Sequence, residues 1–229
     1  MNLFGWGLRA RWERAARSAK PGTALHRYLS ERPPTRATPS DEVPLLAVDL
    51  ETTGLDPKTD YILAVGFVPV DGAAIRLDGA REYVVKVPRE VGQSATVHGI
   101  TDDEMQARGW PLAHVLEEVL TALTGRVLLA HYSTIEEEFL SRACRSVYGA
   151  AMPARVVDTL ELERRLTTNE YDDPRKGTLR LGNARDRHHL PRYRGHAALS
   201  DALACAELYL AQRAVFAERG QRTLGALSS

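Results

Sequence analysis

The feature that most restricts the fold of this chain is the segment 45–56, LLAVDLETTGLD, in which an apolar run ends in two acids. The opening LLAV is typical of a buried strand, and buried strands rarely contain acids. Because side chains alternate between the two faces of a strand, Asp49 and Glu51 point to one side while Val48 and Leu50 point to the other. The segment therefore predicts a strand that presents two carboxylates on one face.

Two carboxylates held side by side repel each other, and a shared proton, a basic neighbour or a divalent cation relieves that repulsion. We favour the cation. The residues that follow, Thr52, Thr53, Gly54 and Leu55, supply hydroxyls and a flexible glycine, and the next two, Asp-Pro, are typical of a turn. This composition suits a strand end that opens onto a cleft.

The whole chain has the length and composition of one domain, or of one domain with an appendage: 229 residues, of which 44% are hydrophobic. Its 30 basic and 30 acidic residues cancel, so affinity for a polyanion would depend on where the basic residues lie. No apolar stretch is long enough to cross a bilayer, and arginines occupy the N-terminal region where a signal peptide is apolar, so we expect a cytoplasmic protein without membrane contact. Cys144 and Cys205 are expected to be buried, reduced thiols.

The N-terminal region predicts a basic amphipathic helix over residues 1–18, with apolar residues at near-helical spacing: Leu3, Trp6, Leu8, Trp12 and Ala15. Such a helix could contact nucleic acid, a membrane surface or a protein partner, but amphipathic helices usually pack on their own core, and we favour that interpretation. A Pro-rich linker follows at 31–44. We expect three parts: a helical arm with its linker (1–42), a catalytic domain (43–217) and a short flexible tail (218–229).

Three β-like runs at 45–52, 61–70 and 81–87 predict an antiparallel meander. Strands at 127–130 and 155–158 then alternate with helices. One helix is expected to begin at about residue 102, and others are expected at 111–123, 134–148, 159–166 and 197–216. Strands first and alternation afterwards predict an α/β fold, in which helices cover a mixed five-stranded sheet.

Residues 173–196 form the most basic stretch of the chain, with seven cations: Arg175, Lys176, Arg180, Arg185, Arg187, Arg192 and Arg194. Beside an acidic site, such a stretch could bind phosphates. A solvated loop and helix face is an equally good interpretation of the same residues.

Two further acids occur where helices begin. Glu136 shares a helical face with Phe139 and Leu140, so it is expected on the inward side of its helix. Asp201 lies at the start of the long helix at 197–216. His196 precedes this helix, so the helical repeat does not set the direction of its side chain, and it could lie over the site to which Asp201 contributes.

Together these residues resemble the DEDD exonuclease superfamily in its histidine-bearing DEDDh branch, which includes the proofreading epsilon subunits of bacterial DNA polymerase III and exonuclease X. The resemblance covers about residues 45–210. It depends on four motifs in the family's order: DLETTGL at 49–55, VHGIT at 97–101, His131 followed by Glu136-x-x-Phe139-Leu140, and His196-x-x-x-x-Asp201.

The resemblance implies a ribonuclease H-like fold and a 3′→5′ exonuclease that uses two divalent ions, Mg²⁺ or Mn²⁺, and releases nucleoside 5′-monophosphates. It implies four metal ligands, Asp49, Glu51, Glu136 and Asp201, with His196 as the general base. By the same resemblance, we expect DNA 3′ ends, with single strands preferred, to contact Thr52, Thr53, Gly54, Leu55 and His98. From the basic stretch, we expect Arg192 and Arg194 to contact the substrate as well. We expect His131 mainly to hold a turn and a helix start.

The chain departs from the family pattern at two positions: Tyr132 stands where Asn is usual, and Glu136 where Asp is usual. Glutamate keeps the charge and the oxygens, so we expect a shifted metal geometry rather than loss of the metal. Two alternatives stay open, an exoribonuclease and a catalytically weakened nucleic-acid-binding module. The stretch after Phe216 lacks the region by which epsilon subunits attach to their polymerase, so we expect a stand-alone nuclease; the N-terminal arm could still bind a protein partner.

Overall fold

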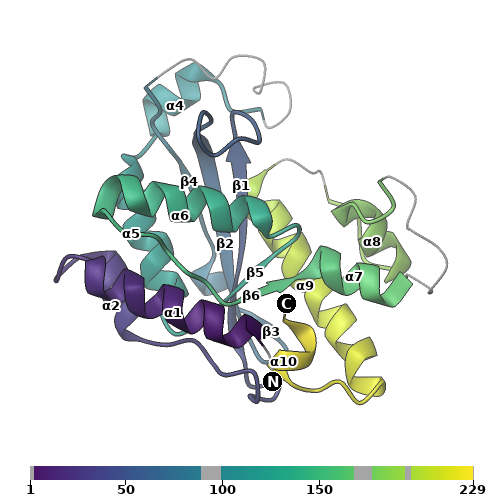
Figure 1. Cartoon of the computed structure of the whole chain (residues 1–229). Coiled ribbons are helices and arrows are strands. Elements are labelled where there is room, and N and C mark those ends of the chain that lie inside the picture. The colour runs from purple at the N-terminus through teal and green to yellow at the C-terminus, as the bar shows by residue number, and fades with distance from the viewer. Residues whose placement is uncertain (1–2, 89–98, 168–176, 194–196, 229) are drawn as a thin grey trace.

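The computed structural model describes residues 3–88, 99–167, 177–193 and 197–228. Its strands form one mixed sheet in the order β3-β2-β1-β5-β6, with β4 paired to β2 (Figure 1). β1 is antiparallel to β2 and parallel to β5, which is parallel to β6. The strands are β1 (Pro44–Thr52), β2 (Ile62–Asp71), β3 (Ala74–Ile75), β4 (Arg81–Val84), β5 (Val127–Ala130) and β6 (Val156–Asp158). The predicted meander and mixed sheet are confirmed, but the sheet has six strands rather than five, because the two-residue β3 is too short for an alternating pattern.

The helices lie close to the predicted segments, among which a helical turn is expected at 25–29, with two additions. They are α1 (Leu3–Ser18), α2 (Ala24–Ser30), α4 (Asp102–Arg108), α5 (Leu112–Leu123), α6 (Thr134–Tyr148), α7 (Thr159–Thr167), α8 (Leu181–Arg187), α9 (Ala198–Glu218) and α10 (Leu224–Leu227), with a 3-10 turn at Leu77–Gly79. α8 forms inside the basic stretch, and α10 forms near the C-terminus. None of the helices in the described part of the chain is long and apolar enough to span a membrane.

The central strand β1 is buried on both faces, which accounts for its uninterrupted apolar start. Leu46 and Val48 belong to a cluster that includes residues of α5 and α6. Leu45 and Ala47 belong to a second cluster that includes residues of α7 and α9. Asp49 follows in the phase of Leu45 and Ala47, so strand alternation directs it toward the side of the sheet that α9 covers.

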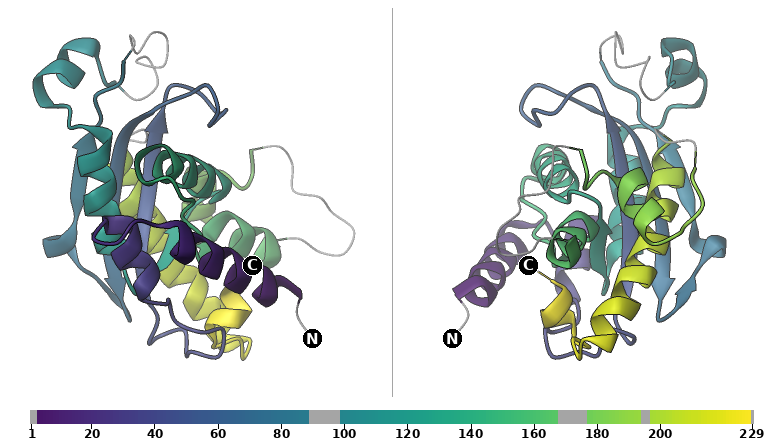
Figure 2. Two further views of the ribbon diagram at one scale, coloured as in Figure 1. Left: turned by 60° about the vertical axis from the view of Figure 1, so that its left-hand side comes forward. Right: turned by 90° about the vertical axis from the view of Figure 1, so that its right-hand side faces the viewer.

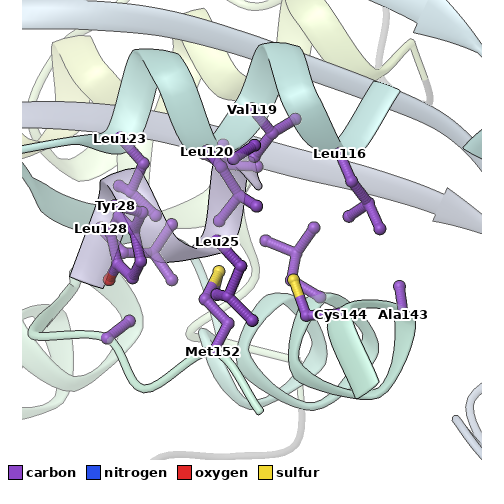
Figure 3. Close-up of a cluster of buried hydrophobic side chains, with 14 of the residues drawn as sticks. Leu25, Tyr28, Leu116, Val119, Leu120, Leu123, Leu128, Ala143, Cys144 and Met152 are labelled. Atoms are coloured by element: carbon purple, nitrogen blue, oxygen red, sulfur yellow. The ribbon is translucent and has the colours of Figure 1, made fainter. Parts of the chain in front are cut away.

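The two N-terminal helices pack against the rest of the fold. Trp12 is 4% exposed, and its indole Nε1 donates a hydrogen bond to the carbonyl of Leu29 (2.9 Å). Leu25 and Tyr28 of α2 lie among side chains of α5 and α6 (Figure 3), and the Tyr28 hydroxyl donates to the carbonyl of Pro153 (2.7 Å). The interpretation of the first helix as one that packs on the core is therefore confirmed. The side chain of Trp6 lies outside the described residues.

The C-terminal segment also packs on the fold. Leu224 and Leu227 of α10 are buried in the cluster that contains β1 and α9 residues. The amide of Leu224 donates to the carbonyl of Thr38 (2.9 Å), and the amide of Ser40 donates to the carbonyl of Arg222 (2.8 Å). This packing is at odds with the expectation of a flexible tail at 218–229, because short segments of the linker and of the C-terminal region pair with each other. The division at residues 42 and 217 stays a prediction.

Candidate active site

A glycine on β2 determines how closely α9 approaches the acids of β1. Gly66 is the register partner of Asp49 on the neighbouring strand. A Cβ added at Gly66 would lie 2.1 Å from the backbone of Ala198 and Leu199, at the first turn of α9. The missing side chain therefore allows the N-terminus of α9 to lie directly against β2, which brings Asp201 to the acids of β1. The sequence analysis did not assign this role, although a glycine inside a strand often marks a close backbone approach.

Three of the four predicted metal ligands form one cluster. Carboxylate oxygens of Asp49, Glu51 and Asp201 lie within 4.8 Å of one another. Burial raises the pKa of Asp49 well above its ordinary value, and the charges of Glu136, Asp201 and Glu51 raise it further. Burial, together with the charges of Asp201 and Glu82, raises the pKa of Glu51 to about 7. The cluster concentrates negative charge that a divalent cation would neutralise.

Glu136, the fourth predicted ligand, lies beside this cluster on the buried face of α6. It is 4% exposed, and among the residues that the structure describes its Oε2 has no hydrogen-bond partner. Burial raises the pKa of Glu136 to about 8, and its charge in turn raises the pKa of Asp49. Glu136 does not belong to the group of three, but its charge acts on Asp49. A buried carboxylate oxygen that accepts no hydrogen bond from the described residues fits a cation site, because hard cations bind oxygen ligands.

An aspartate that the sequence analysis missed holds the start of α6. The carboxylate of Asp158, at the end of β6, accepts hydrogen bonds from the backbone amides of Tyr132 (3.0 Å), Ser133 (2.9 Å) and Leu160 (2.9 Å). These bonds fix the turn before α6 and so help to position Glu136. The available signal was an acid at a strand end, directly before a helix.

One departure from the family pattern, Tyr132 in place of Asn, lies in the turn before α6. Tyr132 has a φ of +73°, in the left-handed region that Asn adopts far more readily than Tyr. Next to it, the buried ring of His131 has Nδ1 2.8 Å from the Thr159 hydroxyl and Nε2 2.9 Å from the carbonyl of Leu179. Burial lowers the pKa of His131. The structural role predicted for His131 is confirmed.

The loop after β1 is held by its own side chains. The Thr52 hydroxyl donates to the carbonyl of Gly54 (2.7 Å), and the Thr53 hydroxyl donates to Oδ1 of Asp60 (3.0 Å). A Cβ at Gly54 would lie 2.5 Å from the Asp60 carboxylate, so the loop needs a glycine there. Leu55 is 78% exposed. The two hydroxyls thus shape the loop, and the apolar side chain of Leu55 stands free at its tip.

The basic stretch is largely occupied with contacts inside the protein. Arg185 is 2% exposed and donates to the carbonyls of Ala204 and Pro191 and to the carboxylate of Glu207. Arg187 pairs with Glu163 at 2.7 Å, and Arg192 pairs with Asp186. Neither of the two interpretations left open for this stretch, phosphate binding or a solvated face, describes Arg185, because Arg185 and Arg187 stabilise the packing of α7, α8 and α9. The contact of Arg192 with substrate stays a prediction, and His98, Arg175, Lys176, Arg194 and His196 lie outside the described residues.

A mixed sheet with helices on its faces and a carboxylate cluster at the end of its central strand defines the class of ribonuclease H-like folds with an acidic metal site. A family model described as RNase_T, exonuclease, matches residues 46–209. The chain therefore belongs to this exonuclease family, within the DEDD exonuclease superfamily. The family and fold expected from the motifs are confirmed.

Two relatives and one solved structure illustrate the similarity. The PolC-type DNA polymerase III of Thermotoga maritima is 29% identical over 200 residues, which cover 83% of this chain and 14% of the polymerase. The DNA polymerase III subunit epsilon of Treponema pallidum is 26% identical over 171 residues, covering 74% of this chain and 76% of that subunit. E. coli exonuclease I, in its zinc-bound complex with single-stranded DNA, superposes with a TM-score of 0.64 at 16% identity, covering 79% of this chain and 42% of that one.

Proposed function

We propose that this chain is a metal-dependent 3′→5′ exonuclease that releases nucleoside 5′-monophosphates from DNA ends and prefers single strands. The observation that carries the proposal is the carboxylate cluster of Asp49, Glu51 and Asp201, with the partnerless Oε2 of Glu136 beside it. The relatives named as DNA polymerase III epsilon and PolC-type polymerase support DNA as the substrate.

The four acids are the residues that would hold two divalent cations. Their ligand atoms are all oxygens, which suits Mg²⁺ or Mn²⁺ rather than softer metals. When bound, such ions supply the positive charge that stabilises the developing charge on the phosphate and on the leaving 3′ oxygen. Glu82 lies close enough to raise the pKa of Glu51, but its Oε1 accepts a hydrogen bond from the amide of Leu199 (3.0 Å), so we assign it to holding the start of α9.

Other residues of this chain would position the substrate and move the proton. In the proposal, His196, five residues before Asp201, takes the proton of the attacking water. The loop Thr52 to Leu55 receives the terminal nucleotide, with the exposed side chain of Leu55 against the base and the loop backbone against the sugar. His98, Arg192 and Arg194 would contact the phosphates.

The proposal is tested by incubating the protein with 5′-labelled DNA and RNA of matched sequence, in magnesium, in manganese and in chelator. We expect a ladder that shortens from the 3′ end of single-stranded DNA, needs metal and disappears with Asp49→Ala. Asp78→Ala is the matched control, because Asp78 is an exposed acid that pairs with Arg76 on the surface. Faster shortening of RNA would replace DNA by RNA in the proposal. Binding without shortening in either metal would contradict catalysis.

A further inference from the structure

Two hollows lie side by side along the outer face of α6. The first, of about 500 Å³, lies between α6 and the loop that continues from the Thr52–Leu55 segment, and its lining includes Lys58, Arg142 and Arg145. The second, of about 380 Å³, lies between α1 and α6, and its lining includes Arg11, Arg14 and again Arg145. In the right-hand view of Figure 2, α1 lies on the outside of the molecule. Because Arg145 lines both hollows, they form one continuous surface.

We call the five cations of this surface the basic band: Lys58, Arg142, Arg145, Arg14 and Arg11. All five are exposed. On each helix the two arginines are three residues apart and so share one face. Arg145 of α6 meets Arg11 and Arg14 of α1 in the lining of the second hollow. The band brings together residues from three separate parts of the sequence: the arm, the loop after β1 and α6.

The basic band differs from the basic stretch at 180–192 in how its charges are used. Among the ion pairs of the described residues, none includes a member of the band. Arg142 donates to the carbonyl of Lys58, at 3.4 Å. Two acids lie close: Asp60 lines the first hollow, with its carboxylate bound to the Thr53 hydroxyl and the Asp56 amide, and Glu137 lies within electrostatic reach of Arg11. The band therefore keeps most of its positive charge available.

The chemistry of the band points to a single strand of nucleic acid. Exposed arginines along a groove bind successive phosphates, and an aromatic ring among them can stack on a base. Tyr61, 36% exposed, lines the first hollow beside Lys58. The loop after β1 connects the acid cluster with this hollow. The loop starts just after Glu51 of the cluster, and its last residues line the hollow. A strand with its 3′ end at the acids can continue from this loop onto α6 and α1.

We propose that the basic band binds the phosphate backbone of the substrate strand on the 5′ side of the terminal nucleotide, so that helix α1 takes part in substrate binding. This inference rests on the proposed function, because it assumes that the 3′ end lies at the acid cluster. It predicts that long single strands bind more tightly than short ones and that the band alone accounts for the difference.

The test measures binding in chelator, where no cleavage occurs, by fluorescence anisotropy of labelled oligothymidylates of about 4 and about 20 nucleotides. The variant is Arg14→Ala/Arg142→Ala/Arg145→Ala. The control is Arg17→Ala/Arg81→Ala/Arg219→Ala, which removes three exposed arginines that line neither hollow. We expect the band variant to weaken binding of the long oligomer about 10-fold or more and to reduce the slope of log K against log salt by about 2, with short-oligomer binding unchanged. The control should lose much less.

Equal effects of the two triple variants on the long oligomer would overturn the band, provided that both melt like the wild type. Loss of binding to vesicles of anionic phospholipid, with DNA binding unchanged, would also overturn it and would identify a membrane-facing surface instead. The proposed function is tested separately by cleavage of the short oligomer in magnesium. If the wild type cleaves no oligomer, the nuclease proposal fails; if it cleaves but shows no length-dependent affinity, only the band fails.

Discussion

Two glutamates, Glu136 of α6 and Glu163 of α7, are both buried in helices but have opposite electrostatic surroundings. Both are almost fully buried, at 4% and 1% exposure. Glu163 accepts hydrogen bonds from Arg187 (2.7 Å), His188 (3.0 Å) and Gln212 (2.8 Å). Burial acts to raise its pKa, but these three donors outweigh burial and lower it. Glu136 has one oxygen without any partner, and its pKa is raised to about 8.

The difference in hydrogen-bond partners distinguishes a buried charge that stabilises the fold from one that is available to bind a ligand. A buried charge that is satisfied inside the chain links its own element to those that supply the donors: Glu163 links α7 to α8, with its C-cap His188, and to α9. A buried charge without donors costs stability, and such a cost is typical of sites that bind a ligand. Four experiments, with substitutions or with added metal, test this contrast.

The largest expected effect is on catalysis at Glu136. We expect Glu136→Gln to lower the exonuclease rate at least about 100-fold, because a neutral amide cannot replace a carboxylate in a site that concentrates divalent charge. The free energy of unfolding in chelator should rise, since burial raises the pKa of Glu136 to about 8 and so makes its ionisation costly in the folded state, a cost that the amide does not carry. Single-turnover cleavage and urea unfolding measure the two effects. Glu138→Gln, on the exposed side of the same helix, is the control and should change neither. A near-wild-type rate for Glu136→Gln would remove it from the site.

Metal addition separates the two glutamates next. Magnesium or manganese at about 100 times its Kd should stabilise the wild type by about 2.7 kcal/mol, because it binds only the folded site. Glu163→Gln should keep this stabilisation, and Asp49→Ala should lose it. Thermal unfolding with and without metal measures the shift. Equal stabilisation of Asp49→Ala and the wild type would place the cation elsewhere.

At Glu163 the expected effect is on stability. Glu163→Gln should lower the free energy of unfolding by about 2 kcal/mol at neutral pH, since Arg187 and His188 lose their anionic partner. The folded-state pKa of Glu163 is lowered below its usual 4.5, so its stabilisation is present above that pH and is lost as the pH falls through the folded-state pKa. Urea unfolding at several pH values should therefore show the two proteins converging at low pH. Glu161→Gln, in an exposed pair with Arg164, should cost much less. A constant difference at all pH values would contradict this assignment.

The smallest expected effect is at the turn that positions Glu136. Tyr132→Asn should raise the free energy of unfolding by about 1 kcal/mol, because Asn adopts the left-handed conformation at lower cost. Tyr132→Phe keeps the bulk and the backbone cost, so it should match the wild type. Chemical denaturation measures both. Destabilisation by Asn would show that the exposed ring of Tyr132 contributes more than its backbone costs.

Several features of the fold and site were predictable because they depend on local periodicity. Strand alternation placed Asp49 and Glu51 on one face, and helical phase placed Glu136 on the buried face of α6. Spacing within short segments survives folding unchanged, so the motif residues and the helix and strand types could be predicted. The number of strands and the packing of residues 218–228 were not, because β3 and α10 are too short to carry a period.

Tertiary structure alone decided which distant groups meet. Gly66 allows α9 to lie against β2 and so brings Asp201 to Asp49, a contact between segments about 150 residues apart that no local pattern encodes. The same packing determined which charges are satisfied. Arg185, in the stretch for which phosphate binding was one of two interpretations, is buried in contacts with α9, whereas Arg145, which no motif includes, lines two open hollows. Residue type and spacing determined the chemistry available to this chain. Long-range packing decided which charged groups can bind a ligand, because neighbours in space determine whether a charge is already paired inside the protein.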